Sequence, residues 1–354
     1  MSICDISVAE MQQLSNPLYI DLRTPSEWRE GNIPQSINLP ILNDDERAEV
    51  GFVYKQIDHK AAKELAFTIA SPKLPGMVSQ IKEYSKSHEV VLYCWRGGLR
   101  SRAIATILDL LDIKVKRLHG GYKGYRQHIL NQLGQYELKE NFVVLHGMTG
   151  VGKTSILEKL QERGFPTLDL EGFAGHRGSS FGGIGLQGLN TQRQFDSLLE
   201  ERLKAIGSTP YYIIEAESRR IGKVMIPQTI MEAKQNGLHF IVEAPLKLRA
   251  ERILKEYTKA LPIDSIWDKI EKPLENLHKQ LLPQTRNELE EAIRQRQLLR
   301  VIEILMVDYY DPKYIHKFKQ YQGVFESIDA TDLDVAVEQI VSLVEKYNAD
   351  MVTV

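Results

Sequence analysis

The segment VVLHGMTGVGKTS, residues 143–155, constrains the fold of this chain more than any other. An apolar, β-branched run precedes a glycine-rich turn, and residues with helical spacing follow, which predicts a strand, a loop and a helix. The turn fits the pattern G-x4-G-K-[ST], in which backbone N–H groups surround a diphosphate and the lysine reaches its outer oxygens. The expected diphosphate-binding residues are Gly147, Thr149, Gly150, Gly152, Lys153 and Thr154. The motif predicts a diphosphate site, with Mg²⁺ at Thr154, but specifies no nucleotide base.

A second strand, turn and helix are predicted at VLYCWRGGLRSR, residues 91–102. Cys94 ends the predicted strand, so the turn and the helix N-terminus would surround its thiol with N–H groups. We expect an anion cradle built from Arg96, Gly97, Gly98 and Arg100, which favours the thiolate, the reactive form of a catalytic cysteine. The alternative is a buried structural cysteine, and the paired glycines and the arginines argue against it.

Strands alternate with helices in both halves of the chain, which predicts two parallel α/β domains. We expect the first domain at 1–129, a polar linker at 130–141, and a P-loop domain with a helical C-terminal region at 142–354. The stretch 115–129 is expected to close the first domain with a strand and a turn. Seven glycines among residues 172–188 predict a loop.

Composition excludes several classes of protein. The net charge of −2 means that any nucleic-acid surface must be local. Two cysteines are too few for a disulfide framework, and no histidine or cysteine spacing predicts a zinc site. The polar N-terminus is unlike a signal peptide, and no apolar run approaches the roughly 18 residues of a membrane span. We therefore expect a cytoplasmic protein without a membrane partner.

The first half resembles the rhodanese family, in the segments DLRTPSEWREGNIPQSINLP, YCWRGGLRS and LHGGYKGY, which cover most of residues 5–128. In that family the cysteine carries a persulfide cradled by the loop. The usual arginine stands five positions after the cysteine, whereas Arg100 is six after Cys94. The pattern Cys-x5-Arg-Ser is also that of cysteine phosphatases, so the loop alone leaves sulfur-type transfer and phosphate chemistry open.

A rhodanese domain followed by a P-loop domain, with EGFAGHRGSSFGG at 171–183, resembles the tRNA 2-selenouridine synthases. The resemblance implies two substrates and no tightly bound cofactor. Geranyl diphosphate alkylates the 2-thio group of a modified wobble uridine, and selenophosphate then replaces the geranylthio group with selenium. Two alternatives remain: an ATP-dependent tRNA sulfurtransferase with a persulfide cysteine, and a non-catalytic tRNA-binding or redox-sensing module.

Charged residues outside the two loops are the remaining candidates. The expected substrate contacts are His176, Arg177, Glu215, Arg219 and Arg220. Asp169 and Glu217 are further acids at strand ends, and Arg249 and Arg252 are one helical turn apart, facing the phosphate site. The anticodon region of tRNA is expected on Lys116, Arg117, Lys123 and Arg126, with Tyr122 and Tyr125 stacking on bases. The alternative for each group is an ordinary solvated face. The oligomeric state is left open.

Overall fold

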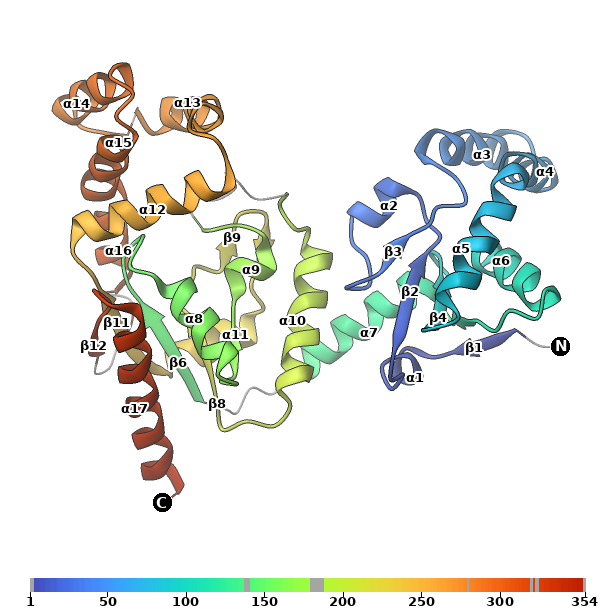
Figure 1. The fold of residues 1–354 in the computed structure, drawn as a ribbon, viewed down its shortest axis with the longest axis horizontal. Helices are drawn as coiled ribbons and strands as arrows, with labels where there is room; N and C mark the ends of the chain where they lie inside the picture. Colours follow the sequence, from blue (N-terminus) through green and yellow to red (C-terminus); the bar gives the residue numbers. More distant parts are fainter. Residues whose placement is uncertain are drawn as a thin grey trace. The chain divides into compact units, whose positions relative to one another are not determined.

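The computed structural model describes residues 3–136, 141–178, 188–278, 280–318, 321 and 325–352. Their contacts divide the chain into two compact units (Figure 1). Unit 1 holds Met1–Gln135 with Thr191–Glu200, and unit 2 holds Tyr136–Asn190 with Glu201–Val354. Each unit contains a five-stranded sheet whose paired strands are all parallel. The predicted pair of parallel α/β folds is confirmed.

The sheet of unit 1 has the strand order β1-β5-β4-β2-β3. Its strands are β1 (Cys4–Ile6), β2 (Pro17–Asp21), β3 (Ile37–Asn38), β4 (Glu89–Tyr93) and β5 (Lys116–Leu118). Its helices are α1 (Val8–Met11), α2 (Pro25–Arg29), α3 (Asp44–Gln56), α4 (His59–Ala70), α5 (Leu74–Tyr84), α6 (Leu99–Leu110) and α7 (Gly121–Gln135), with a 3-10 turn at Ser71–Lys73. Strands β2 and β4 pack apolar side chains against α5 and α6, and this core fixes the end of β4 from which Cys94 follows.

Helix α7 differs from the turn that the sequence predicted after β5. It begins at Gly121 and puts Tyr122, Tyr125 and Ile129 on one buried face, at the spacing of an α-helix. The sequence did not predict this helix because its first turn contains Gly121 and Gly124, and glycine has a low helix propensity. The helix also runs into the expected linker at 130–141. Asn141 already belongs to the next strand, and residues 137–140 lie outside the described part of the chain.

The sheet of unit 2 has the strand order β12-β11-β6-β8-β7. Its strands are β6 (Asn141–His146), β7 (Thr167–Leu168), β8 (Tyr211–Glu215), β11 (Leu238–Glu243) and β12 (Phe325–Asp329), and a small antiparallel pair is β9 (Arg220–Ile221) with β10 (Val224–Met225). The helices α8 (Lys153–Glu162) and α17 (Leu333–Val352) share one apolar core with β6, β11 and β12. Edge strand β12 corrects the prediction that the C-terminal region is entirely helical.

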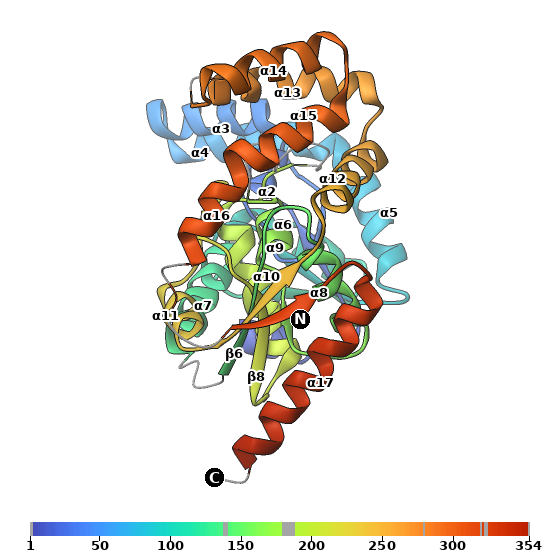
Figure 2. The same ribbon diagram turned by 90° about the vertical axis from the view of Figure 1, so that its left-hand side faces the viewer.

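Helix α10 (Gln192–Ile206) belongs to unit 1 up to Glu200 and to unit 2 from Glu201. The remaining helices of unit 2 are α9 (Leu170–Ala174), α11 (Gln228–Gln235), α12 (Leu246–Ala260), α13 (Ile263–His278), α14 (Pro283–Arg294), α15 (Leu298–Leu305) and α16 (Asp311–Phe318), with a π-helical turn at Met306–Tyr310 between the last two. Helices α12 to α15 form a second apolar core of their own (Figure 2). Helix α9 enters the loop predicted at 172–188, of which residues 179–187 are not described. Within the described residues, no helix is both long and apolar enough to cross a bilayer.

Candidate functional site

The loop between β6 and α8 has the backbone of a phosphate-binding turn. Gly147, Gly150 and Gly152 have φ of 150°, 81° and 100°, values that side chains rarely adopt. Space is short as well, because a Cβ atom on Gly147 would lie 2.6 Å from the carbonyl oxygen of Val242, and one on Gly150 would lie 2.7 Å from that of Arg249. The glycine spacing in the sequence is therefore a steric requirement of this loop.

The two functional side chains of the loop are held by neighbouring oxygens. Lys153 Nζ donates to the carbonyl oxygen of Gly147 at 2.9 Å. Thr154 Oγ1 donates to Oε1 of Glu215 at 3.0 Å, which joins the loop to the end of the adjacent strand β8. A bound diphosphate would compete with both acceptors for these donors.

Three carboxylates meet beside Thr154. Oxygen atoms of Glu171, Glu215 and Glu217 all lie within 4.8 Å of one another. Burial raises the pKa of Glu215 to about 8, and burial together with the other two carboxylates raises the pKa of Glu171 well above its usual range. Oε2 of Glu215 is buried without a hydrogen-bond partner. An all-oxygen set with one unsatisfied carboxylate oxygen fits a hard divalent cation such as Mg²⁺, held by Thr154, Glu171 and Glu215.

Arg249 and Arg252 donate hydrogen bonds to the backbone of the phosphate-binding loop. This corrects the expectation that they face the phosphate site. Arg249 donates to the carbonyl oxygen of Thr149 at 3.0 Å and forms a bidentate pair with Asp311. Arg252 donates to the carbonyl oxygens of Val151 and Ala330. Their donors are directed at the backbone, so they fix the loop conformation.

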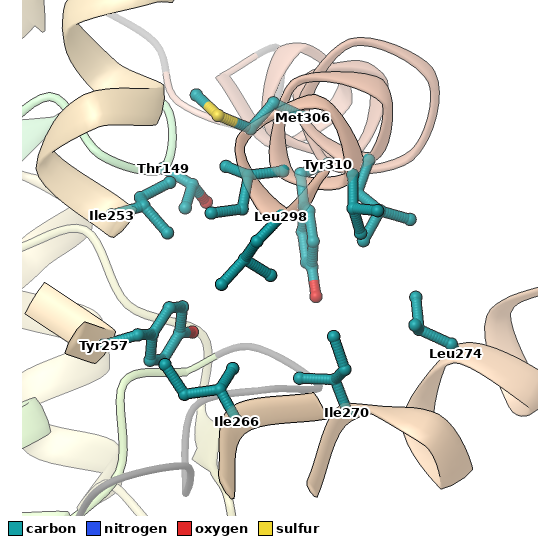
Figure 3. Close-up of a pocket in the computed structure, with 12 residues that line it drawn as sticks. Thr149, Ile253, Tyr257, Ile266, Ile270, Leu274, Leu298, Met306 and Tyr310 are labelled. Carbon is teal, nitrogen blue, oxygen red and sulfur yellow. The ribbon is translucent and has the colours of Figure 1, made fainter. Parts of the chain in front are cut away.

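An apolar cavity adjoins the loop (Figure 3). Thr149 is its one residue from the P-loop, and helices α12, α13 and α15 with the π-helical turn supply the rest. The lining residues are Thr149, Ile253, Tyr257, Ile266, Ile270, Leu274, Leu298, Val301, Ile302, Leu305, Met306 and Tyr310. Oγ1 of Thr149 is buried without a hydrogen-bond partner. Sequence reasoning missed this cavity, although apolar residues four apart along α13 predict a buried helix face.

The other expected substrate contacts lie in different surroundings. Arg219 is exposed and lines a polar cavity beside the P-loop, whereas Arg220 is exposed on β9 and donates to the carbonyl oxygen of Gly222. Arg177 pairs with Glu256, and the pKa of His176 is lowered by burial. Asp169 caps α9 by accepting from the backbone of Gly172, so its role is structural.

The cysteine loop of unit 1 also has the predicted conformation. Cys94 directly follows β4, is buried, and its Sγ lies 3.3 Å from Oγ of Ser101 on α6. The turn 118–121 closes on it, because a Cβ on Gly121 would lie 2.3 Å from the Cys94 carbonyl oxygen. The amide of Tyr122 donates to the same oxygen at 2.8 Å. The cysteine loop and the turn at 118–121 are therefore in direct contact.

The arginines around this cysteine are not equivalent. Arg100 forms a bidentate ion pair with Glu27 at 2.5 and 3.1 Å and is mostly buried. Arg96 and Arg102 are exposed. Of the two arginines in the expected cradle, Arg96 is therefore exposed, whereas the charge of Arg100 is partly neutralised by Glu27.

Three of the four cations of the expected tRNA-binding patch are paired with carboxylates, and one of these three is buried. Arg117 is buried, pairs with Asp5 and donates to the carbonyl oxygen of Gly97. Lys116 pairs with Glu89, and Arg126 pairs with Asp196. The rings of Tyr122 and Tyr125 are buried and cannot stack on bases. Of the four cations in the patch, Lys123 is the exposed one.

Comparison with known proteins identifies both halves of the chain. Residues 7–128 match the rhodanese-like domain, and residues 140–341 match the family model described as the tRNA 2-selenouridine synthase AAA domain. Fold and loops thus define a fusion of a rhodanese-like domain with a P-loop domain.

Proteins called tRNA 2-selenouridine synthase resemble the chain over most of its length. Those of Aeromonas salmonicida and Psychromonas ingrahamii are 31% and 30% identical, over 90% and 89% of this chain and 93% of each relative. That of Pseudomonas fluorescens is 31% identical, over 87% of this chain and 90% of its own. The chain belongs to the tRNA 2-selenouridine synthase family.

Proposed function

We propose that this protein modifies tRNA in two steps, S-geranylation of a 2-thiouridine and then replacement of the geranylthio group by selenium. The name of its relatives supports the tRNA product. The observation that carries the first step is the apolar cavity that adjoins the phosphate-binding loop through Thr149. A prenyl diphosphate needs an anion site and an apolar site in direct contact.

In the first step the diphosphate is the leaving group. The C1–O bond of geranyl diphosphate breaks, its electron pair passes to the diphosphate oxygens, and the thio sulfur bonds to C1. The loop amides and Lys153 lie where this charge grows and stabilise it with preorganised donors. Mg²⁺ on Thr154, Glu171 and Glu215 would supply further positive charge. The Glu215 carboxylate gains its missing partner in that arrangement.

The cavity favours an alkyl chain over a nucleotide base. Its walls are aliphatic apart from Thr149, Tyr257 and Tyr310, so an adenine ring would lose its hydrogen bonds to water there. The volume is about 50 Å³. On that scale one group the size of a water or methylene needs about 10–15 Å³, so roughly four carbons enter. The carbons of a geranyl chain nearest the diphosphate would be buried in the cavity, and the rest of the chain would extend outside it.

In the second step selenium replaces sulfur at the cysteine loop. The selenium of selenophosphate attacks C2 of the S-geranyl base, geranylthiolate leaves and takes up a proton, and water cleaves the Se–P bond to release phosphate. The glycine turn and Arg96 bind the phosphoryl group of the donor, and the sulfur of Cys94 positions its selenium for the attack on C2. The alkylated C2 loses its sulfur substituent more readily than a thiocarbonyl.

The test is mass spectrometry of tRNA nucleosides after incubation with geranyl diphosphate and then with selenophosphate. We expect S-geranyl-2-thiouridine after the first addition and 2-selenouridine after the second, without ATP consumption. Lys153→Ala should weaken geranyl diphosphate binding about tenfold or more, because a charged hydrogen bond contributes roughly 1.5–3 kcal/mol. Product formation that requires stoichiometric ATP hydrolysis would instead establish the sulfurtransferase alternative.

A further inference from the structure

A second cavity, of about 250 Å³, opens on the other part of the phosphate-binding loop. Gly147 and Lys153 line it, whereas Thr149 lines the apolar cavity. The P-loop therefore contributes to two cavities of different chemistry. A reaction at the loop can draw one reactant from each.

Four residues with uncharged side chains, three of them aromatic, line this second cavity. They are His146, Met231, Tyr314 and Tyr321, and the rings of His146 and Tyr321 meet edge to face with centroids 4.6 Å apart. Nε2 of His146 lies 2.9 Å from Nδ1 of His239, and burial with the neighbouring His239 lowers the pKa of His146 to about 3. A neutral aromatic ring can pack against these rings, and Lys153 Nζ lies 5.6 Å from the centroid of the Tyr314 ring.

The same cavity also has hydrogen-bonding groups in its lining. Glu217, Ser218 and Arg219 follow β8 in succession and line the cavity with a carboxylate, a hydroxyl and an exposed guanidinium. Donors and acceptors in one short row match the edge of a 2-thiopyrimidine, which presents the C4 carbonyl oxygen and the N3–H. The apolar cavity offers no comparable row.

We propose that this polar cavity receives an unstacked 2-thiopyrimidine base of tRNA, with its sulfur directed at the P-loop. The proposal rests on the proposed function and assigns the alkylation wholly to unit 2. Enzymes that act on a base take it out of the stack into such a pocket. The sulfur would then meet the C1 atom of a prenyl chain that reaches the loop from the apolar cavity.

The step is balanced as follows. The S–C1 bond forms as the C1–O bond breaks, and the diphosphate leaves with the electron pair. The C2=S bond becomes a single bond, N3 and C2 form a double bond, and the N3 proton passes to the departing diphosphate. No oxidant, reductant or further reactant takes part.

Met231→Trp, which fills the cavity from α11 without changing the P-loop, tests the proposal. The substrates are anticodon stem-loops that carry 2-thiouridine or an abasic site at the wobble position. The parental protein should prefer the thiouridine stem-loop roughly tenfold or more, as expected for one stacked base. Met231→Trp should bind both equally and keep the parental affinity for geranyl diphosphate. The matched control is Met225→Trp, at an exposed methionine on β10 outside the cavity.

Two results would overturn the proposal: equal binding of the two stem-loops by the parental protein, or undiminished preference in Met231→Trp. The outcome is independent of catalysis. If the parental protein binds the thiouridine stem-loop selectively but forms no S-geranyl product, the proposed function fails and the base pocket stands.

Discussion

Leu298→Trp should separate binding of the prenyl chain from binding of the diphosphate. Leu298 begins α15 and projects into the middle of the apolar cavity (Figure 3). A tryptophan there would occupy the space that admits roughly four carbons. At about 0.8 kcal/mol for each buried methylene, the variant loses about 3 kcal/mol of binding free energy, or roughly 200-fold in affinity for geranyl diphosphate.

The assay is titration calorimetry with geranyl diphosphate and with inorganic diphosphate. Inorganic diphosphate should bind the variant within about twofold of the parental protein, because the P-loop is unchanged. Overpacking costs typically 1–3 kcal/mol of stability, so urea unfolding must accompany the titrations. Leu282→Trp, at an exposed leucine in the same helical part of unit 2, is the matched control. Parental affinity for geranyl diphosphate in Leu298→Trp would refute the assignment of the cavity.

Three further predictions concern single side chains. Cys94→Ser should accumulate S-geranyl-2-thiouridine without 2-selenouridine in nucleoside mass spectrometry; selenouridine at the parental rate would make Cys94 structural. Arg249→Met should lower the free energy of unfolding by about 3 kcal/mol in urea titrations, because Asp311 loses its partner in a mostly buried pair; a change under 1 kcal/mol would contradict this bracing role. The pKa of His146 is about 3 in the folded chain, against an ordinary histidine value of 6.5. Between these two pH values the unfolded chain binds more protons than the folded chain. The free energy of unfolding therefore falls as the pH drops below about 6.5, by up to 1.4 kcal/mol per pH unit. His146→Gln should flatten that slope in urea titrations between pH 6.5 and 5, and an unchanged slope would exclude His146 as its source.

Local sequence patterns predicted the phosphate-binding loop and the cysteine loop, because the backbone constraints that require their glycines arise within a few residues. The positive φ at Gly147, Gly150 and Gly152 follows from the motif itself. The partners of the charged residues were not predictable in this way, because Arg100 and Glu27 are 73 residues apart and Arg117 and Asp5 are 112 apart.

Long-range packing also explains why the sequence did not predict the apolar cavity, strand β12 or the role of Glu171 in unit 2. The apolar cavity requires α12, α13 and α15 to meet, and the edge position of β12 requires pairing with β11 far earlier in the chain. An amphipathic pattern predicts that a helix has a buried face but does not identify what covers it. Glu171 was passed over for the same reason, since only folding brings it to Glu215 and Glu217.

The contact between Lys153 and the carbonyl oxygen of Gly147 affects the heat of ligand binding. Because the ammonium donates to this carbonyl oxygen at 2.9 Å, a diphosphate that binds Lys153 exchanges one hydrogen bond for another. Part of the enthalpy expected for a new charged contact is therefore cancelled. Burial of an alkyl chain, in contrast, gives a negative heat-capacity change. The temperature dependence of the binding enthalpy, more than its size at one temperature, would then report which of the two halves of a prenyl diphosphate the protein has engaged.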